Sequence, residues 1–349
     1  MPSFVQRIQH WQQQFGRHHL PWQQDQDPYK VWLSEIMLQQ TQVSTVLEYY
    51  QRFLQRFPTV VELARASQEE VMPYWAGLGY YARARNLHKC AQIVVQDYAG
   101  QFPHSAEVLA TLPGIGKSTA NAIAAFCFNA TTPIMDGNVK RVFTRFFGIT
   151  GYDTKTEKQL WEKAYQLVKE EQAIGQYNQG LMDLGSMICT RNKPQCQSCP
   201  LQQDCFAKQH NQQQNLPTQK PKKEQPQRET IMLILASQTH IWLQQRPQTG
   251  IWGGLLSLPE LANQQELTQW LKQYPAFSAI RLASFEHIFS HYRLIIHPFL
   301  IQCATTASLQ ENTFPSGKWY ALTELDKLAL PSPVSKLLSG IKEMQPQLC

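Results

Sequence analysis

The sequence predicts two domains, an all-α domain at the N-terminus and a smaller α+β domain at the C-terminus. Three observations lead to this prediction. The 349 residues exceed what one hydrophobic core usually organises. Apolar residues recur at three- and four-residue spacing in the first two thirds of the chain and alternate with polar residues in the last third. A polar, proline-rich segment lies between the two patterns. We therefore expect domains at residues 1–207 and 229–349, joined by a basic linker at 208–228.

Composition predicts a globular protein. Hydrophobic residues make up 43% of the chain and charged residues 17%, which is too apolar for a disordered protein and too poorly charged for a coiled coil. No stretch reaches the ~18 apolar residues of a membrane helix, and the first fifteen residues lack the apolar core of a secretory signal. We expect a cytoplasmic protein that does not bind a membrane.

The formal net charge of +6 favours an anionic partner such as nucleic acid. Many cytosolic proteins without such a partner are equally basic, so the charge alone does not identify one.

The first domain is predicted to be helical throughout. Val139, Val142 and Phe143 show the spacing that places apolar side chains on one face of a helix. Residues that end helices separate the predicted segments. These stops are Pro58, Pro73, Gly100–Pro103, Pro113–Gly116, Pro133 and Gly148–Gly151.

The linker and the second domain follow. Residues 208–228 contain three prolines and a lysine cluster with almost no large apolar side chain, which is typical of a semi-extended linker. Beyond it, alternating patterns predict strands at 231–235, 241–243, 284–289 and 294–301. Helical patterns at 264–273 and 333–341 complete an α+β domain.

Residues 112–120 (LPGIGKSTA) predict a tight turn between two helices, the second beginning near Lys117. Gly114 and Gly116 permit close backbone approach, and the free N–H groups at the start of the second helix can hold a DNA phosphate without reading sequence. An ordinary glycine turn between packed helices explains the same residues.

Two carboxylates are candidates for acid and base chemistry. Glu35 stands among apolar neighbours in residues 31–38, where burial should raise its pKa, as suits a general acid. The alternative is that it stabilises a bend or pairs with a distant arginine. Asp136 precedes the helix that contains Val139, and it could serve only as an N-cap.

Two further segments have side chains suited to nucleic acid. The glutamines at positions 39, 40 and 42 can hydrogen-bond base edges, although they are equally suited to a solvated surface. Residues 75–86 combine a glycine turn with Tyr80, Tyr81, Arg83 and Arg85. An aromatic side chain can enter a base stack while arginines hold phosphates. A helix end followed by core tyrosines is the alternative.

Four of the eight cysteines lie within one short segment, in the spacing Cys189-x6-Cys196-x2-Cys199-x5-Cys205. Clustered cysteines in a reducing compartment indicate metal binding. One CxxC pair flanked by two single cysteines differs from the paired CxxC units of a zinc ribbon, so we favour a [4Fe–4S] cluster. The scattered cysteines are expected to be small buried apolar residues.

Together these motifs resemble the helix-hairpin-helix base-excision DNA glycosylases, most closely the MutY-type adenine glycosylases. The resemblance rests on residues 34–43 (SEIMLQQTQV), 77–86 (GLGYYARARN), 112–120 and 135–141 (MDGNVKR) and on the cysteine spacing, all in the family's order. It implies two helical lobes with a hairpin and a [4Fe–4S] cluster loop, followed by a MutT-like (Nudix-like) domain.

The resemblance also implies a function. Adenine opposite 8-oxoguanine or guanine in duplex DNA would be flipped out and protonated by Glu35, while Asp136 stabilises an oxocarbenium ion and Asn138 hydrogen-bonds nearby. We expect a monomer that contacts DNA through Gln40, Tyr80, Arg83, Gly114, Gly116, Lys117, Ser118, Lys140, Phe289, Ser290 and His291, the last three in a loop for 8-oxoguanine.

Two rival functions remain. Endonuclease III-like enzymes also cut the backbone, using a lysine two residues after the hairpin's second glycine. That position is Ser118 here, and Lys117, one residue earlier, should point about 100° away. A damage-binding protein without catalysis is the other rival. In the second domain, residues 253–271 contain only Glu260 and Glu266, so we expect this domain to recognise a base and not to hydrolyse nucleotides.

Overall fold

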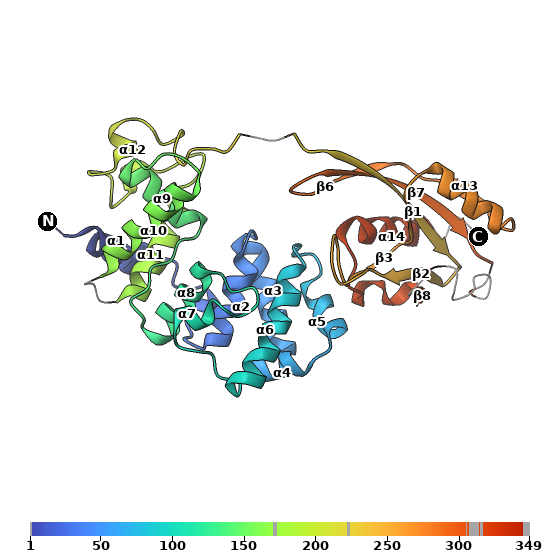
Figure 1. Cartoon of the computed structure of the whole chain (residues 1–349), viewed down its shortest axis with the longest axis horizontal. Coiled ribbons are helices and arrows are strands. Elements are labelled where there is room, and N and C mark those ends of the chain that lie inside the picture. The colour runs from blue at the N-terminus through green and yellow to red at the C-terminus, as the bar shows by residue number, and fades with distance from the viewer. Residues whose placement is uncertain are drawn as a thin grey trace. The chain divides into compact units, whose positions relative to one another are not determined.

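The structure is a computed structural model that describes residues 2–169, 173–221, 224–304, 306, 314 and 317–344. It divides into two compact units (Figure 1). The first comprises Met1–Ala66 and Asn86–Lys222, and the second comprises Ser67–Arg85 and Lys223–Cys349. Among the described residues, no helix has the length and apolar character needed to cross a membrane.

The part of the chain before residue 210 contains helices and no described strand, which confirms the all-α prediction. Polar N-caps start many of the helices; Ser3, Thr59 and Ser67 each form a reciprocal capping box. The helices are α1 (Phe4–Phe15), α2 (Pro28–Leu38), α3 (Val43–Arg56), α4 (Val60–Arg65), α5 (Gln68–Trp75), α6 (Ala82–Tyr98), α7 (Ala106–Leu109), α8 (Lys117–Phe128), α9 (Gly137–Phe147), α10 (Thr154–Val168), α11 (Ile174–Met187) and α12 (Phe206–Gln209).

One predicted helix stop is wrong. Pro73 lies inside α5, which continues to Trp75. A proline in a helix loses one backbone hydrogen bond. Met72 and Trp75 are almost completely buried, and their burial keeps the chain helical past the proline.

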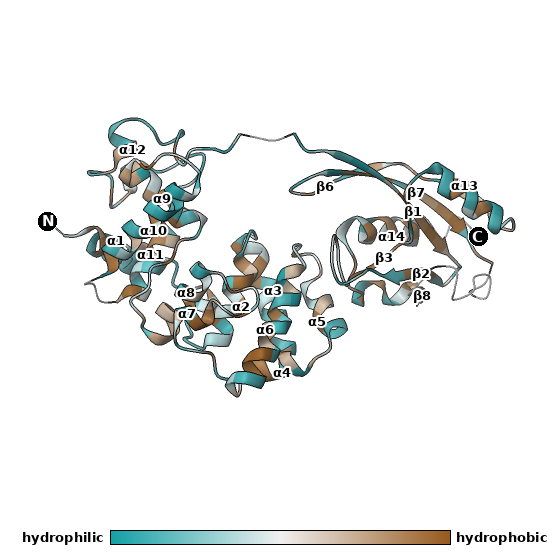
Figure 2. Ribbon diagram, in the orientation of Figure 1, coloured by the Kyte–Doolittle hydropathy of each residue, from teal (hydrophilic) through white to brown (hydrophobic). Residues whose placement is uncertain are grey.

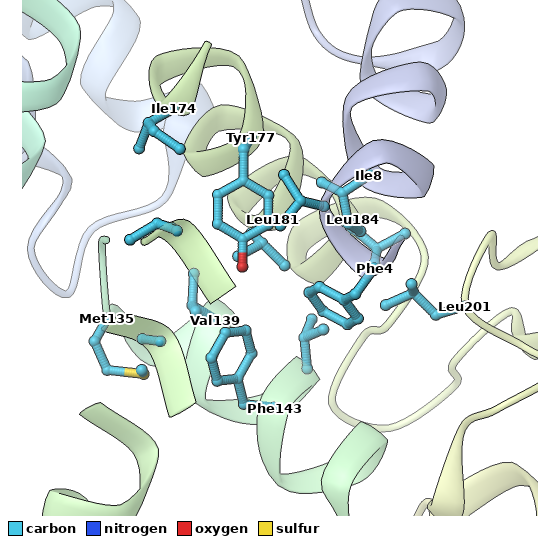
Figure 3. Packing of buried hydrophobic residues seen from close by; sticks show 14 of the residues in the cluster. Phe4, Ile8, Met135, Val139, Phe143, Ile174, Tyr177, Leu181, Leu184 and Leu201 are labelled. Carbon is cyan, nitrogen blue, oxygen red and sulfur yellow. The ribbon is translucent and has the colours of Figure 1, made fainter. Parts of the chain in front are cut away.

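One hydrophobic core of the first unit joins α1, α9, α10 and α11. Phe4 and Ile8 of α1 lie against Phe143 of α9 and Tyr177 of α11 (Figure 3). The buried apolar residues of α9 lie on one face, as their spacing predicts. This core fixes the start of α9, where one of the candidate catalytic residues lies.

The second unit contains a mixed sheet in which β1 and β7 pair in parallel over ten residues and the other described strand pairs are antiparallel. Both faces of β1 are buried beyond its third residue, and Figure 1 shows α13 and α14 on opposite sides of β1 and β7. The α+β prediction is confirmed. The elements are β1 (Gln227–Ala236), β2 (His240–Gln245), β3 (Leu256–Ser257), β4 (Glu260–Leu261), α13 (Gln264–Gln273), β5 (Ala279–Arg281), β6 (Phe285–Ile288), β7 (Arg293–Gln302), β8 (Gly317–Ala321) and α14 (Ser332–Met344).

The predicted linker is only partly a linker. It is hydrophilic along most of its described length (Figure 2). Its first half nevertheless packs on the helical unit: Leu216 is buried and its carbonyl accepts a hydrogen bond from Arg145, and the Thr218 hydroxyl accepts one from the backbone of Gly151. At the other end, Gln227 and Arg228 belong to β1.

Candidate active site

A cavity of about 1630 Å³ lies within the first unit. Glu35 of α2 and Asp136, the residue before α9, both line it. Gln40, Ser118 and Asn138 line the same cavity. Residues from three separate sequence motifs are therefore brought to one space.

Glu35 is partly buried and lines the cavity. Burial raises the pKa of Glu35 to about 8, and the nearby charge of Asp136 adds to the increase. Among the described residues, none forms an ion pair or side-chain hydrogen bond with its carboxyl, so the alternative of a distant arginine partner is wrong. A carboxyl in this environment is largely protonated at neutral pH and can give up a proton to a ligand.

Asp136 caps α9 and also lines the cavity. One carboxylate oxygen accepts the backbone N–H of Val139 at 2.7 Å, and the other accepts the side-chain amide of Asn138 at 3.0 Å. Met135 and Val139 on either side are buried in the core (Figure 3). The N-cap interpretation is correct and does not exclude a functional one, because the cap fixes the direction of the carboxylate.

Two polar side chains that sequence reasoning missed hold the extended segment before Asp136. The fully buried amide of Asn178 accepts from the backbone of Ile134 and donates to that of Thr132. Asn121 donates to the carbonyl of Pro133. Amides within otherwise apolar helices are the signal that would have pointed to them, since buried polar groups need partners.

Ser118 also supports this segment, because its hydroxyl accepts the backbone N–H of Met135 at 3.1 Å. Its neighbour Lys117 is exposed, and its ammonium lies 4.2 Å from the ring centre of Trp161 and 4.9 Å from that of Tyr165. Gly114 has a φ of +78°, and a Cβ there would lie 2.9 Å from Asn86, so the hairpin turn requires glycine.

The side chain of Asn138 is held in place by Arg141. Its side-chain oxygen accepts from Arg141 at 2.9 Å, and Arg141 also donates to the carbonyls of Gly185 and Cys189. Lys140, expected to contact DNA, forms an ion pair with Glu157 of α10 at 2.5 Å.

The four clustered cysteines lie close together in the loop after α11. Burial raises the pKa of Cys199 to about 12 and raises that of Cys205, and charges on neighbouring cysteines add to both increases. Cys189 and Cys199 pack against the helical core. In the part of the chain that the structure describes, no group of three or more metal-binding side chains is arranged to share a single metal ion.

Tyr80 lies in the turn between α5 and α6, and Arg83 is the second residue of α6; both belong to the second unit. Tyr80 is 52% exposed and has a φ of +48°. Arg83 donates to the carbonyls of Leu78 and Gly79, which fixes the turn. Burial lowers the pKa of Arg83 to about 10. The Tyr80 ring lies 5.7 Å from the Arg83 guanidinium and is exposed, so it can contact a ligand.

Phe289, Ser290 and His291 form the turn between β6 and β7. The backbone N–H of Phe289 donates to the carbonyl of Tyr292 at 2.9 Å, and the ring of Phe289 lies 5.3 Å from that of Trp252. Ser290 and His291 are exposed. This turn therefore exposes two polar side chains next to a pair of packed aromatic rings.

The two glutamates in residues 253–271 have structural partners. Glu260 pairs with Arg246, and Glu266 accepts the backbone N–H of Ala262 at 2.7 Å.

The fold and the cavity define a base-excision DNA repair protein. Residues 33–166 match the model of the HhH-GPD superfamily of base excision DNA repair proteins, and residues 230–340 match that of the NUDIX domain. A solved thermostable thymine-DNA glycosylase aligns with 59% of this chain and 95% of its own, with a TM-score of 0.54 and 29% identity.

Relatives that align over nearly the whole chain identify the family within this class of repair proteins. The chain is 37% identical to an adenine DNA glycosylase of Buchnera aphidicola over 97% of this chain and 98% of the relative. It is 33% identical to the human adenine DNA glycosylase over 95% of this chain and 72% of that protein. The chain belongs to the adenine DNA glycosylase family, and it is a DNA glycosylase.

Proposed function

We propose that this protein removes adenine paired with 8-oxoguanine or guanine in duplex DNA and leaves the backbone uncut. The observation that carries the proposal is the pair of carboxyl groups that line one cavity, one with a strongly raised pKa and one anchored at a helix start. Without its raised pKa, Glu35 would be an anion like Asp136 and could not act as the acid.

The proposed reaction assigns a different role to each group. An adenine flipped into the cavity takes the proton of Glu35 on a ring nitrogen, and the bond between the base and the sugar breaks as its electron pair leaves with the base. Asp136 stabilises the resulting oxocarbenium ion, and Asn138 holds Asp136 in position. Water then adds to the sugar carbon and gives a proton to the Glu35 carboxylate, which restores the acid.

Two observations support a glycosylase that does not cut the strand. The position of the lyase nucleophile is a serine whose hydroxyl is engaged with the chain before Asp136. The neighbouring Lys117 rests on the rings of Trp161 and Tyr165, and it does not line the cavity.

The function is tested with end-labelled duplexes that contain one A:8-oxoguanine, A:G or A:T pair. We expect strand breaks only after alkali treatment, and only for the first two duplexes. Breaks that form without alkali would contradict the proposal and favour a bifunctional lyase. Binding without any break, before or after alkali, would favour a damage-binding protein.

Recognition of 8-oxoguanine is proposed for the β6–β7 turn. The turn exposes the hydroxyl group of Ser290 and the imidazole of His291. Both groups can form hydrogen bonds with the edge of an oxidised guanine. In the same assay, Ser290→Ala combined with His291→Ala should lower the rate for A:8-oxoguanine more than the rate for A:G. Equal losses for both substrates would contradict this assignment.

We propose a [4Fe–4S] cluster on Cys189, Cys196, Cys199 and Cys205. The charges of the other three cysteines add to the raised pKa of Cys199, so the four lie near one another. Within the described residues, no three metal-binding side chains are arranged around a single ion. Four-iron clusters place each thiolate on a different iron and therefore need a wider arrangement than zinc. When bound, the cluster would supply a rigid, electron-rich anchor for the loop.

The cofactor is tested on protein purified without air. We expect about four irons per chain and a broad visible absorption band. Replacing any one of the four cysteines with serine should reduce the iron content, whereas Cys127→Ser, outside the loop, should not. Stoichiometric zinc in place of iron would contradict the assignment.

A further inference from the structure

The guanidinium of Arg145, near the end of α9, is one of the most deeply buried charged groups in the first unit, with 2% of the residue exposed. It donates to the carbonyls of Thr190 at 2.7 Å and Arg191 at 2.9 Å. It also donates to the sulfur of Cys189 at 3.4 Å and to the carbonyl of Leu216 at 2.9 Å. Arg145 therefore connects the cysteine loop to the segment that leads out of the helical unit.

The charge of Arg145 has no carboxylate partner among the described residues. Arg17 in the same unit does have a carboxylate partner, because it forms an ion pair with the buried Asp183 at 2.8 Å. Buried charges are usually paired in this way. Carbonyl oxygens satisfy the hydrogen bonds of Arg145 but supply no negative charge. An uncompensated buried cation is strongly disfavoured, so an anion is expected within its reach.

We propose that Arg145 is a positioning residue that supplies the positive charge balancing the cysteine-bound iron–sulfur cluster. The inference rests on the cofactor proposed above. A cluster with four thiolates carries net negative charge, and the Arg145 guanidinium already contacts one of the four sulfurs. Arg141 and Arg191 also interact with this region, but both are more exposed than Arg145.

The expected consequence is retention of iron and a higher reduction potential. Hydrogen bonds to charged groups change an equilibrium by roughly tenfold to a hundredfold. Arg145→Met should therefore speed the loss of iron to a chelator at least about tenfold. Because a reduced cluster is more negative than an oxidised one, its midpoint potential should fall by about 60 mV for each tenfold preference lost.

Two matched variants separate charge from packing. Arg145→Lys keeps the charge and should stay within about threefold of the wild type in iron loss, with a smaller potential shift than Arg145→Met. Lys158→Met removes an exposed charge from α10 of the same unit and should change neither quantity. Equal effects of the lysine and methionine variants would overturn the proposal, since they would show that only the shape of the arginine matters.

A second comparison applies if Arg145→Met retains no iron. The folded fraction of the iron-free variant is then compared with that of iron-free wild type by circular dichroism. Equal folding would support the proposal, because only the metal-bound state would need the charge. Unfolding of the variant alone would overturn it. If wild-type protein itself contains no iron, the cofactor proposal fails first. If wild type contains iron and the variant matches it in potential and iron loss, only the role of Arg145 fails.

Discussion

Asp136→Asn is expected to lower the single-turnover rate of adenine release by about 10³-fold. An anion about 4 Å from a developing cation contributes roughly 4 kcal/mol at an effective dielectric constant of about 20, which corresponds to that factor. Asparagine is an equally good N-cap, so the start of α9 should be preserved. Affinity for the mismatched duplex, measured by fluorescence anisotropy, should remain within a few-fold of the wild type.

Asp153→Asn is the matched control. Asp153 caps α10 with the same hydrogen bond to the third residue of its helix, and it does not line the cavity. It should leave the rate unchanged. A similar loss of rate in both variants, or a loss of folding and binding in Asp136→Asn, would show that Asp136 acts only as a cap.

Glu35→Gln is expected to lower the rate by about 10² to 10⁴-fold, the range typical for removal of a general acid. In the wild type, the rate should fall as pH rises through about 8, because the carboxyl loses its proton there. The residual rate of the variant should lack this decline. Glu48→Gln, an exposed change on α3, should keep the wild-type pH profile. A wild-type rate that stays constant to pH 9.5 would contradict the role of Glu35.

The same pKa predicts an effect on stability. Between the ordinary value of 4.5 and about 8, the folded protein keeps a proton that the unfolded chain has already lost. The free energy of unfolding should therefore decrease as pH rises across this window. Glu35→Gln should remove this decrease and increase stability at pH 7 by a few kcal/mol, measured by urea unfolding at several pH values. A variant less stable than the wild type at pH 7 would contradict the buried, protonated state.

Local features made several parts of the site predictable. An acid among apolar residues at helical spacing predicts burial, and burial alone raises its pKa. An aspartate before an apolar-periodic segment predicts a cap, and the cap sets the direction of its carboxylate. The hairpin glycines predict a helix start at Lys117, which the structure confirms.

Contacts between distant segments were not predictable. The partners of Arg145 are 44 to 71 residues away, and no short-range pattern indicates them. Likewise, Asn178 reaches back 44 residues to hold Ile134. The polar residues around Leu216 in the sequence gave no sign that it would be buried. Leu216 nevertheless packs on the helical unit, and its carbonyl accepts a hydrogen bond from Arg145 of α9. In the second unit, alternation identified β1 and β7 but not their parallel register.

Gly185 of α11 has a consequence for which substitutions the chain can accept. A Cβ at this position would lie 2.6 Å from the Cβ of Asn138, so the two helices touch where no side chain intervenes. Even alanine would push the first turn of α9 outward, and the aspartate that precedes it would move as well. The position of Asp136 in the cavity therefore depends partly on a residue that has no side chain. Inherited changes there would damage repair while both carboxyl groups remained intact.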